Sequence, residues 1–429
     1  MIDRYKNSKK LFRKAVKVIP TGSQTFSKSY MQWPYNVSPM FLKEGKGCIV
    51  KDVDNNKYVD YLLALMPIIL GYANKEVDDK VIQQIKQGTI LSLSHPSEVE
   101  LSEKLVSIIP YAQMVKFSKN GSDVLSAAIR LSRAYTNREL VAVSGYHGWH
   151  DWYIGTTSRS RGIPKGTMKL TKKFISNDIE SLNKLLGKSP EKFAAIVVEP
   201  ESFEEANLSF LKEVRRICNK FGIILVFDEV ICGFRTEFGG ASRKYGIHAD
   251  LGCFGKAMAN GYPLAALVGK SKIMRKLDDV FVSGTFSGEI LSIVACLKTL
   301  KILERDNIIN NLSCLGNNLK RGFNHILEKN NLLNQVAFEG SDWWPRLNVK
   351  ETKIDKLLFS TLLRQEFLSN GLFIGASLNL CQSHNENKIK KKTTRLFEKS
   401  IRSFKFKVED KNPKKHLKGK KIESIFKIR

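Results

Sequence analysis

The sequence has no run of apolar residues approaching the ~20 that a helix needs to span a bilayer. No uninterrupted apolar segment of the kind found in a secretory signal follows its first residues. Internal repeats and low-complexity linkers are also missing. These absences argue against membrane, fibrous and repeat proteins, and we expect a soluble, cytoplasmic protein. With 429 residues, of which 42% are hydrophobic, the chain can form two or three structural units around a sizeable core.

Cysteine is scarce, and no two cysteines have the CxxC spacing of a metal or redox site. The seven are Cys48, Cys218, Cys232, Cys253, Cys296, Cys314 and Cys381. We interpret them as reduced thiols in or near the core, and we predict no metal site.

Acidic residues are few, because 42 Asp and Glu stand against 70 Lys and Arg and leave a net charge of +28. The excess is densest in residues 388–429, which hold 17 basic and 4 acidic side chains. This segment either contacts a polyanion or is a solvated chain end with the lysine-rich composition of the whole protein. We favour the solvated end and expect no nucleic-acid partner, because the segment lacks interleaved aromatic residues and follows no nucleic-acid-binding module.

From residue 113 onward, apolar runs alternate with amphipathic helical segments, which is the pattern of a mostly parallel α/β sheet. The predicted strands are Met114–Ser118, Leu140–Ser144, Ala194–Val198, Ile223–Phe227, Leu251–Phe254 and Leu264–Val268. The predicted helices are Ser122–Tyr135, Leu208–Phe221 and Glu289–Arg305. Such sheets bind ligands at the carboxyl ends of their strands, so the residues after each run are the candidates for chemistry.

The two ends of the chain have a different texture. A helix is predicted over residues 3–18, and strands over 40–46, 48–52 and 57–63. Past residue 305 we predict helices over 312–329 and 355–369 and short strands near 336–338, 344–349 and 372–374. We therefore divide the chain into an N-terminal segment that joins a small domain (1–65), a large domain (66–310), a C-terminal small domain (311–410) and a basic tail (411–429).

Two of the predicted strands are followed by residues suited to an anion or an aromatic ring. Gly121 and Ser122 lie between the first strand and the next helix, where backbone N–H groups can hold a phosphate. An ordinary N-cap turn gives the same pattern. Tyr146 and His147 follow the next strand between two glycines. The tyrosine ring either lies over a bound ring or packs against its own loop.

Two further strand ends carry ionisable groups. Asp228 follows a fully apolar strand, and a buried carboxylate is costly unless a cation or strong donor pairs with it. Lys256 follows another strand, where desolvation would lower its pKa, as an amine that forms a Schiff base requires. Taken alone, Lys256 could be a surface lysine that begins a helix. An amine, an acid, an aromatic ring and an anion cradle at one sheet edge together predict a pocket for pyridoxal 5′-phosphate (PLP).

Six motifs then make a family resemblance recognisable. They occur in order at residues 120–138, 145–149, 198–200, 227–235, 255–263 and 284–288. With them the chain resembles the class III PLP-dependent aminotransferases, and most of all the branch that contains glutamate-1-semialdehyde 2,1-aminomutase, from about residue 19 to about residue 400. The resemblance implies the type I aminotransferase fold. This fold has a large domain with a mixed, mostly parallel sheet and a smaller α+β domain built from both chain ends.

The resemblance also implies roles for individual residues. Lys256 would form the Schiff base and carry a proton between substrate and cofactor, and Asp228 would keep the pyridine nitrogen protonated. Val230 and Tyr146 would pack on opposite faces of the ring.

The cofactor phosphate would be bound by Gly121 and Ser122, helped by Thr285, which in this family reaches across from the partner subunit. That implies a homodimer with two shared sites. Glu199 and His147 are assigned supporting positions near the cofactor.

The chain departs from the family pattern in ways that bear on its substrate. Lys119 and Asn120 replace residues of the usual Asn-Ser-Gly-Thr-Glu-Ala run, which suggests altered contacts beside the phosphate site. Residues 201–206 replace a glycine-containing turn, and we expect this change to affect specificity.

Residues 155–173 are more basic and poorer in glycine than the gating loop of the aminomutase. We therefore favour an intermolecular aminotransferase over the intramolecular amino shift of an isomerase. It would use a donor such as glutamate and an aldehyde or ketone acceptor.

Basic and aromatic side chains could line the entrance to such a site and suit a phosphorylated or nucleotide-linked, sugar-type acceptor. They are Arg159, Arg161, Lys165, Trp149, Trp152 and Tyr153. An exposed loop without a ligand is the alternative. A third hypothesis is a degenerate aminotransferase scaffold that binds polyanions.

Overall fold

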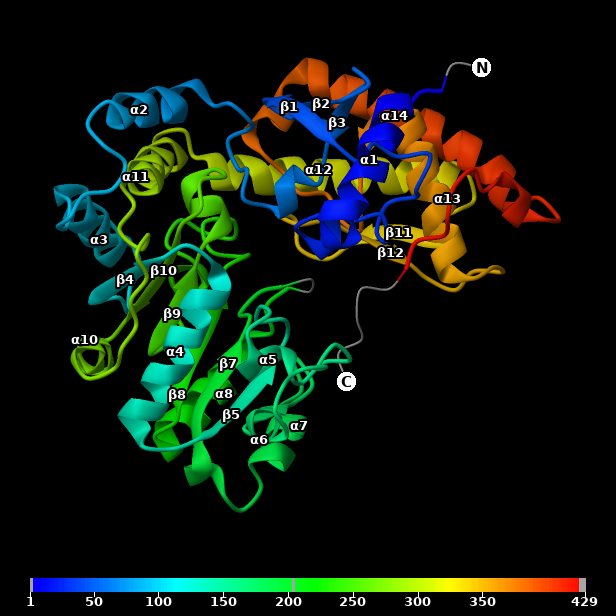
Figure 1. Cartoon of the computed structure of the whole chain (residues 1–429). Coiled ribbons are helices and arrows are strands. Elements are labelled where there is room, and N and C mark those ends of the chain that lie inside the picture. The colour runs from blue at the N-terminus through cyan, green and yellow to red at the C-terminus, as the bar shows by residue number, and fades with distance from the viewer. Residues whose placement is uncertain (1–2, 203–204, 424–429) are drawn as a thin grey trace. The chain divides into compact units, whose positions relative to one another are not determined.

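The computed structural model describes residues 3–202 and 205–423 (Figure 1). The chain divides into two compact units. One combines the N-terminal part of the chain, up to Asn74, with the part from Asn311 onward, and the other runs from Lys75 to Asn310. A small unit built from both chain ends is the arrangement that the type I aminotransferase fold requires.

The larger unit contains a seven-stranded sheet in the order β4-β10-β9-β8-β7-β5-β6. Its strands are β4 (Met114–Ser118), β5 (Leu140–Ser144), β6 (Thr171–Lys173), β7 (Phe193–Val198), β8 (Ile224–Glu229), β9 (Leu251–Phe254) and β10 (Ala265–Gly269). Of these seven strands, β10 pairs antiparallel with both its neighbours, whereas β5 to β9 are parallel. The predicted mixed, mostly parallel sheet is confirmed.

Apolar burial explains why these segments form a sheet core. All six residues of β7 are buried, as expected for a strand covered on both faces. Helix α4 (Gly121–Thr136) packs its small and aliphatic face on the sheet, with Ala128 and Leu131 fully buried beside Val197 and Val226. The position of α4 fixes where its first turn, with Gly121, opens toward the edge of the sheet.

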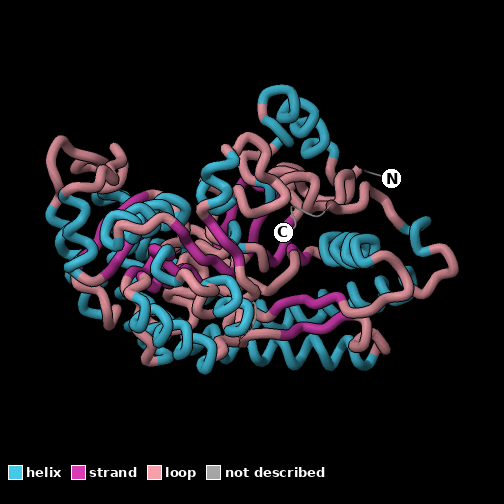
Figure 2. The backbone as a smooth tube through the Cα atoms, turned by 90° about the horizontal axis from the view of Figure 1, so that it is seen from below, coloured by secondary structure: helices cyan, strands magenta, loops and turns pink. Residues whose placement is uncertain are grey.

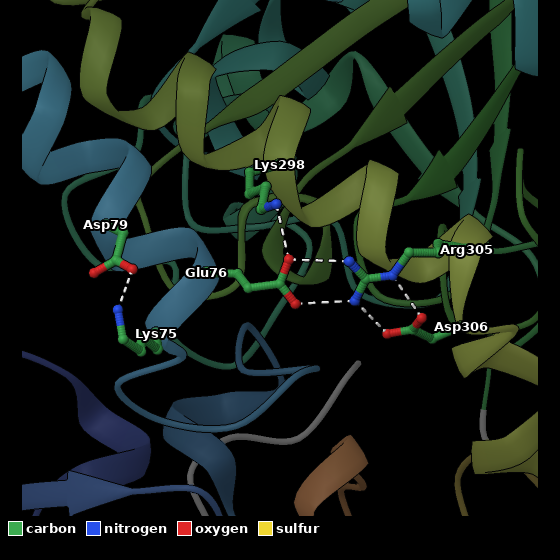
Figure 3. A network of polar contacts seen from close by, with 6 residues as sticks. All are labelled: Lys75, Glu76, Asp79, Lys298, Arg305 and Asp306. Atoms are coloured by element: carbon green, nitrogen blue, oxygen red, sulfur yellow. Dashed lines mark hydrogen bonds and ion pairs between the residues drawn. The ribbon is translucent and has the colours of Figure 1, made fainter.

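The larger unit contains further helices around this core. They are α2 (Lys75–Ile85), α3 (Pro96–Ile108), α5 (Asp151–Ile154), α6 (Lys165–Lys169), α7 (Ile179–Leu186), α8 (Leu208–Phe221), α9 (Ala241–Tyr245), α10 (Ser271–Met274) and α11 (Ile290–Arg305). An ion-pair network links α2 to α11 (Figure 3). In it, Glu76 lies 2.9 Å from Arg305 and 2.8 Å from Lys298. Hydrogen bonds from Arg305 and, to a smaller extent, from Lys298 lower the pKa of Glu76 to about 2. This carboxylate is therefore ionised at neutral pH.

The smaller unit has a four-stranded sheet in the order β1-β2-β3-β13 and a separate two-stranded ribbon; Figure 2 draws the strands in magenta. The strands are β1 (Leu42–Lys46), β2 (Ile49–Asp52), β3 (Lys57–Asp60), β11 (Val336–Glu339), β12 (Arg346–Val349) and β13 (Leu372–Phe373). The helices are α1 (Lys6–Val18), α12 (Ile308–Lys329), which begins in the larger unit, α13 (Lys356–Ser369) and α14 (Asn387–Val408). Because β13 pairs in parallel with β3, this sheet joins the two ends of the chain.

The C-terminal basic segment is not a solvated chain end, so that prediction is wrong for the described residues. Helix α14 packs on α13, and beyond it Lys418 N donates to Gln365 Oε1 (2.9 Å) and Ile422 N donates to Thr361 Oγ1 (3.1 Å). Ile422 is only 4% exposed. Apolar residues at helical spacing, hidden among the lysines, supply the buried face of α14: Ile389, Phe397, Ile401 and Phe404. Residues 424–429 of this segment lie outside the described residues.

Six of the seven cysteines are buried, Cys314 is exposed, and all seven are free thiols. The interpretation of reduced core thiols therefore holds for six of them. Across residues 3–202 and 205–423, no helix is both long and apolar enough to cross a bilayer.

Candidate cofactor-binding site

Five strand ends of the larger unit carry the predicted site residues. Gly121 begins α4 after β4, and the loop after β5 carries Tyr146 and His147. Glu199 directly follows β7. Asp228 is the second-last residue of β8, and Lys256 follows β9 by two residues in a short 3-10 helix (Lys256–Ala259).

Close approach of Gly121 to Val230 brings two of these segments together. A Cβ atom on Gly121 would lie 2.7 Å from Val230 Cγ1, which is closer than side chains can pack. A Cβ on Gly255, the residue before Lys256, would lie 3.5 Å from the same Val230 atom. The start of α4 and the segment that carries Lys256 therefore both lie close to Val230, the residue directly after β8.

Asp228 has a buried partner, His147. His147 Nδ1 lies 2.8 Å from Asp228 Oδ2, and His147 Nε2 lies 2.9 Å from the carbonyl oxygen of Ser144. Because both ring nitrogens face acceptors, the geometry favours the doubly protonated imidazolium. Burial works to lower the pKa of His147, but the hydrogen bond and charge of Asp228 outweigh it and the net pKa is raised. The other Asp228 oxygen accepts the N–H of Val230 at 3.1 Å.

Lys256 has the electrostatics of a nucleophilic amine. Burial lowers its pKa to about 8, against the opposing charges of Asp228 and Glu199. Its backbone is held at φ +43°, a left-handed conformation that costs a residue with a side chain roughly 1–3 kcal/mol. Strain of that size at a strand end is typical of residues whose position serves a function.

Glu199 is the second titratable group near Lys256. Burial and the charge of Asp228 raise its pKa to about 7. Its Oε2 accepts the N–H of Tyr146 at 3.2 Å, which ties the end of β7 to the loop after β5. The Tyr146 ring is 42% exposed and meets Tyr153 edge to face at 5.7 Å between centroids. Part of this side chain is therefore accessible at the end of β5.

The start of α4, the predicted phosphate-binding segment, is a capped helix turn. Asn120 N donates to Asp123 Oδ2 at 2.9 Å, which closes the N-terminal turn of this 16-residue helix. Ser122 Oγ accepts the N–H of Trp149 at 3.4 Å, and a Cβ on Gly148 would meet the same oxygen at 2.3 Å. The loop after β5 therefore covers the first turn of α4 from one side.

These residues fit PLP. Gly121 and Ser122 at a helix N-terminus suit its phosphate, and the Asp228–His147 pair suits its pyridine nitrogen. Lys256 supplies an amine for its aldehyde.

Among the described residues, Thr285 makes no hydrogen bond or ion pair with Gly121 or Ser122, although it shares a cavity with residues that flank them. It is exposed on the loop before α11 and lines a cavity of about 580 Å³ with Lys119, Asp123 and His150. Its assignment to a partner subunit's site stays a prediction.

The expectation that residues 201–206 affect specificity stays a prediction. Glu201, the first of them, is buried, and its carboxylate accepts hydrogen bonds from Thr236, Lys244 and Tyr245. This residue therefore has a structural role in the larger unit. Residues 203–204 of the same run lie outside the described residues.

The prediction that aromatic side chains line the entrance is wrong for two of the three residues. Trp152 and Tyr153 are buried, and Trp152 Nε1 donates to Ser126 Oγ at 3.0 Å, so neither lines an entrance. Trp149, by contrast, is 68% exposed. Arg161 and Lys165 are exposed too.

The family model described as "Aminotransferase class-III" matches residues 30–341. The chain belongs to this family. It is a PLP-dependent enzyme, and the predicted family, fold class and cofactor are confirmed.

Relatives of this class III aminotransferase have more than one activity. A 3-aminobutyryl-CoA aminotransferase of Cloacimonas acidaminovorans is 38% identical over 352 residues, which is 80% of this chain and 84% of the relative. A glutamate-1-semialdehyde 2,1-aminomutase of Methanosphaera stadtmanae is 33% identical over 403 residues, 87% of this chain and 92% of the relative. The FumI protein of Sphingopyxis sp. MTA144, solved with PLP, is 25% identical with a TM-score of 0.87 and covers 97% of this chain and 99% of its own.

Proposed function

We propose that this enzyme transfers an amino group from a donor such as glutamate to an aldehyde or ketone acceptor, in two half-reactions. The observation that carries the proposal is the set of ionisable groups at one sheet edge: a lysine with a lowered pKa, a buried aspartate paired with a histidine, and Glu199 beside them. PLP, when bound, supplies an electron sink for the substrate Cα.

Each residue then has a physical task. Asp228, paired with His147, would hold a proton at the pyridine nitrogen of the cofactor. With a pKa of about 8, about a tenth of Lys256 is neutral at pH 7, against under one in a thousand at its ordinary pKa. The neutral Nζ can attack a carbonyl carbon and later give or take the substrate Cα proton. Val230 and Tyr146 confine the faces of the ring.

We further propose that the acceptor carries phosphate, as in a nucleotide-linked or phosphorylated compound. The relative named for a CoA-linked amino acid supports this class, because CoA contains a phosphorylated nucleotide. Exposed basic residues of the 155–173 segment, among them Arg161, Lys165 and Lys169, supply positive charge for such a group.

A homodimer with shared sites is part of the proposal. Large apolar side chains are exposed on the segment before α3, among them Leu91 (53%) and Leu93 (86%). Exposed apolar patches of this kind mark surfaces that associate. The partner subunit's Thr285 would then complete the phosphate site.

The aminomutase relatives keep an intramolecular amino shift as the second candidate. An aminomutase converts a single substrate without an external acceptor, and mass spectrometry distinguishes the two reactions. The polyanion-binding scaffold remains the third hypothesis, against which the retained Lys256 and Asp228 argue.

The test begins with the visible absorption of the purified protein. We expect a band from PLP attached to Lys256, loss of this band in Lys256→Ala, and conversion of the band by one amino donor in a screen. Products of acceptor mixtures are then identified by mass spectrometry. A protein that binds PLP but reacts with no donor would refute the aminotransferase.

A further inference from the structure

The loop at residues 281–289 of the larger unit exposes two phenylalanines and Thr285. Phe281 is 81% and Phe286 59% exposed. The loop has internal order, since Ser287 N donates to Gly284 O (3.0 Å) and Glu289 N donates to Phe286 O (3.1 Å). An ordered loop with two phenylalanine rings exposed to water requires contacts with the rest of the unit that fix its position.

Lys119 holds the C-terminal end of the loop. Its Nζ lies 2.8 Å from Glu289 Oε2 and 3.3 Å from Ser292 Oγ. The two charged side chains are 19% and 17% exposed, so water screens the pair less than an ordinary surface pair. Glu289 also accepts the N–H groups of Leu291 and Ser292 and so caps α11. Lys119 directly precedes Asn120–Ser122. Its side chain therefore joins the start of α11 to this segment.

Arg130 holds the other end. Its Nη1 donates to the carbonyl oxygen of Phe281 at 2.8 Å. Arg130 lies on α4, nine residues after Gly121, so about 13 Å of rigid helix separates the two residues. Both ends of the loop are therefore fastened to one element, the β4–α4 segment that contains Asn120–Ser122.

We propose that Lys119 and Arg130 are positioning residues that clamp the 281–289 loop to the β4–α4 segment, so that Thr285 is presented to the cofactor phosphate of a second copy of the chain. The proposal rests on the shared-site dimer of the proposed function. It adds a role for Lys119, which departs from the usual family pattern.

The first readout is hydrogen exchange of the loop in wild type, Lys119→Met, Lys119→Arg and Arg130→Met. Lys104→Met is the matched control, because it breaks an ion pair of equal length, Lys104–Glu304 at 2.8 Å, on α3 and α11. We expect the amides of Ser287 and Glu289 to exchange at least about tenfold faster in the two methionine variants at 119 and 130. Lys119→Arg and the control should match wild type.

The second readout is the affinity for pyridoxine 5′-phosphate, which has no aldehyde for Lys256, with unphosphorylated pyridoxine as comparison. The clamp predicts about tenfold weaker binding of the phosphate compound in Lys119→Met and Arg130→Met, since the loss of a charge-assisted contact has about that effect. Binding of pyridoxine should be unchanged.

Unchanged loop exchange would overturn the clamp, and faster exchange with unchanged phosphate affinity would overturn its role at the cofactor. A wild-type protein without a PLP absorption band would instead refute the proposed function, while the exchange result would still show whether the loop is clamped.

Discussion

Replacing His147 by leucine is the sharpest test of the buried pair at the site. The substitution removes the cation beside Asp228, which is 5% exposed and, among the described residues, keeps the Val230 N–H as a partner. Removing one partner of a buried ion pair costs about 3–5 kcal/mol. For a unit of this size, that lowers the melting temperature by roughly 6–20 °C. We expect this loss in cofactor-free protein, measured by thermal unfolding.

The pH dependence of this loss has a defined sign. The folded-state pKa of His147 is raised above its ordinary value of 6.5. Stability from its protonated form is therefore fully present below pH 6.5 and declines as the pH rises through the raised pKa. The difference in melting temperature between wild type and His147→Leu should shrink at alkaline pH.

Two controls accompany the measurement. His325→Leu removes an exposed histidine 3.7 Å from Glu328 and should change stability by less than about 0.5 kcal/mol. The double variant His147→Leu/Asp228→Asn removes both charges and should recover part of the loss. A His147→Leu protein within about 1 kcal/mol of wild type at pH 6 would contradict a charged buried pair.

Three further predictions concern single contacts. Gly121→Ala forces a methyl group against Val230 Cγ1 at 2.7 Å; we expect a loss of about 1–3 kcal/mol in thermal unfolding and weaker PLP binding by absorbance titration. Burial raises the pKa of Glu229 from 4.5 to about 8, so stability present below pH 4.5 is lost as the pH rises toward 8. Glu229→Gln should flatten this dependence and gain on the order of 3 kcal/mol at pH 7, and an unchanged pH profile would show that Glu229 is ionised when buried. Ile422→Ala should cost about 2–4 kcal/mol if the C-terminal segment is packed as described, whereas a solvated end would show no change.

Much of the sheet was predictable because buried parallel strands are continuous apolar runs. Strands β4, β5 and β9 have the predicted bounds, β7 begins one residue earlier, and β8 and β10 differ by one or two residues at each end. Strand β6, Thr-Lys-Lys at the sheet edge, has no apolar run to reveal it. Helix α14 does have apolar residues at helical spacing. It was missed because nine basic residues stand among them.

The site was predictable only in part. The positions of Asp228 and Lys256 follow from strand ends, but the partner of Asp228 does not, because His147 lies 81 residues earlier in the sequence and meets it only when β5 and β8 are placed in one sheet. The contact of Lys119 with Glu289 spans 170 residues and is equally invisible in the sequence pattern. The only sign of these contacts in the sequence was that each ionisable residue lies at or near the end of a predicted strand or the start of a predicted helix.

The four ionisable groups at the sheet edge divide into two functional pairs. Asp228 and His147 hold opposite charges through direct contact, which suits a fixed electrostatic role at the ring nitrogen. Glu199 and Lys256 have pKa values of about 7 and 8, so these two change protonation near neutral pH. Groups that exchange protons during turnover need pKa values near the working pH. We therefore propose proton transfer for Lys256, whose pKa is lowered by burial against the opposing charges of Asp228 and Glu199, and an electrostatic role at the ring nitrogen for the Asp228–His147 pair.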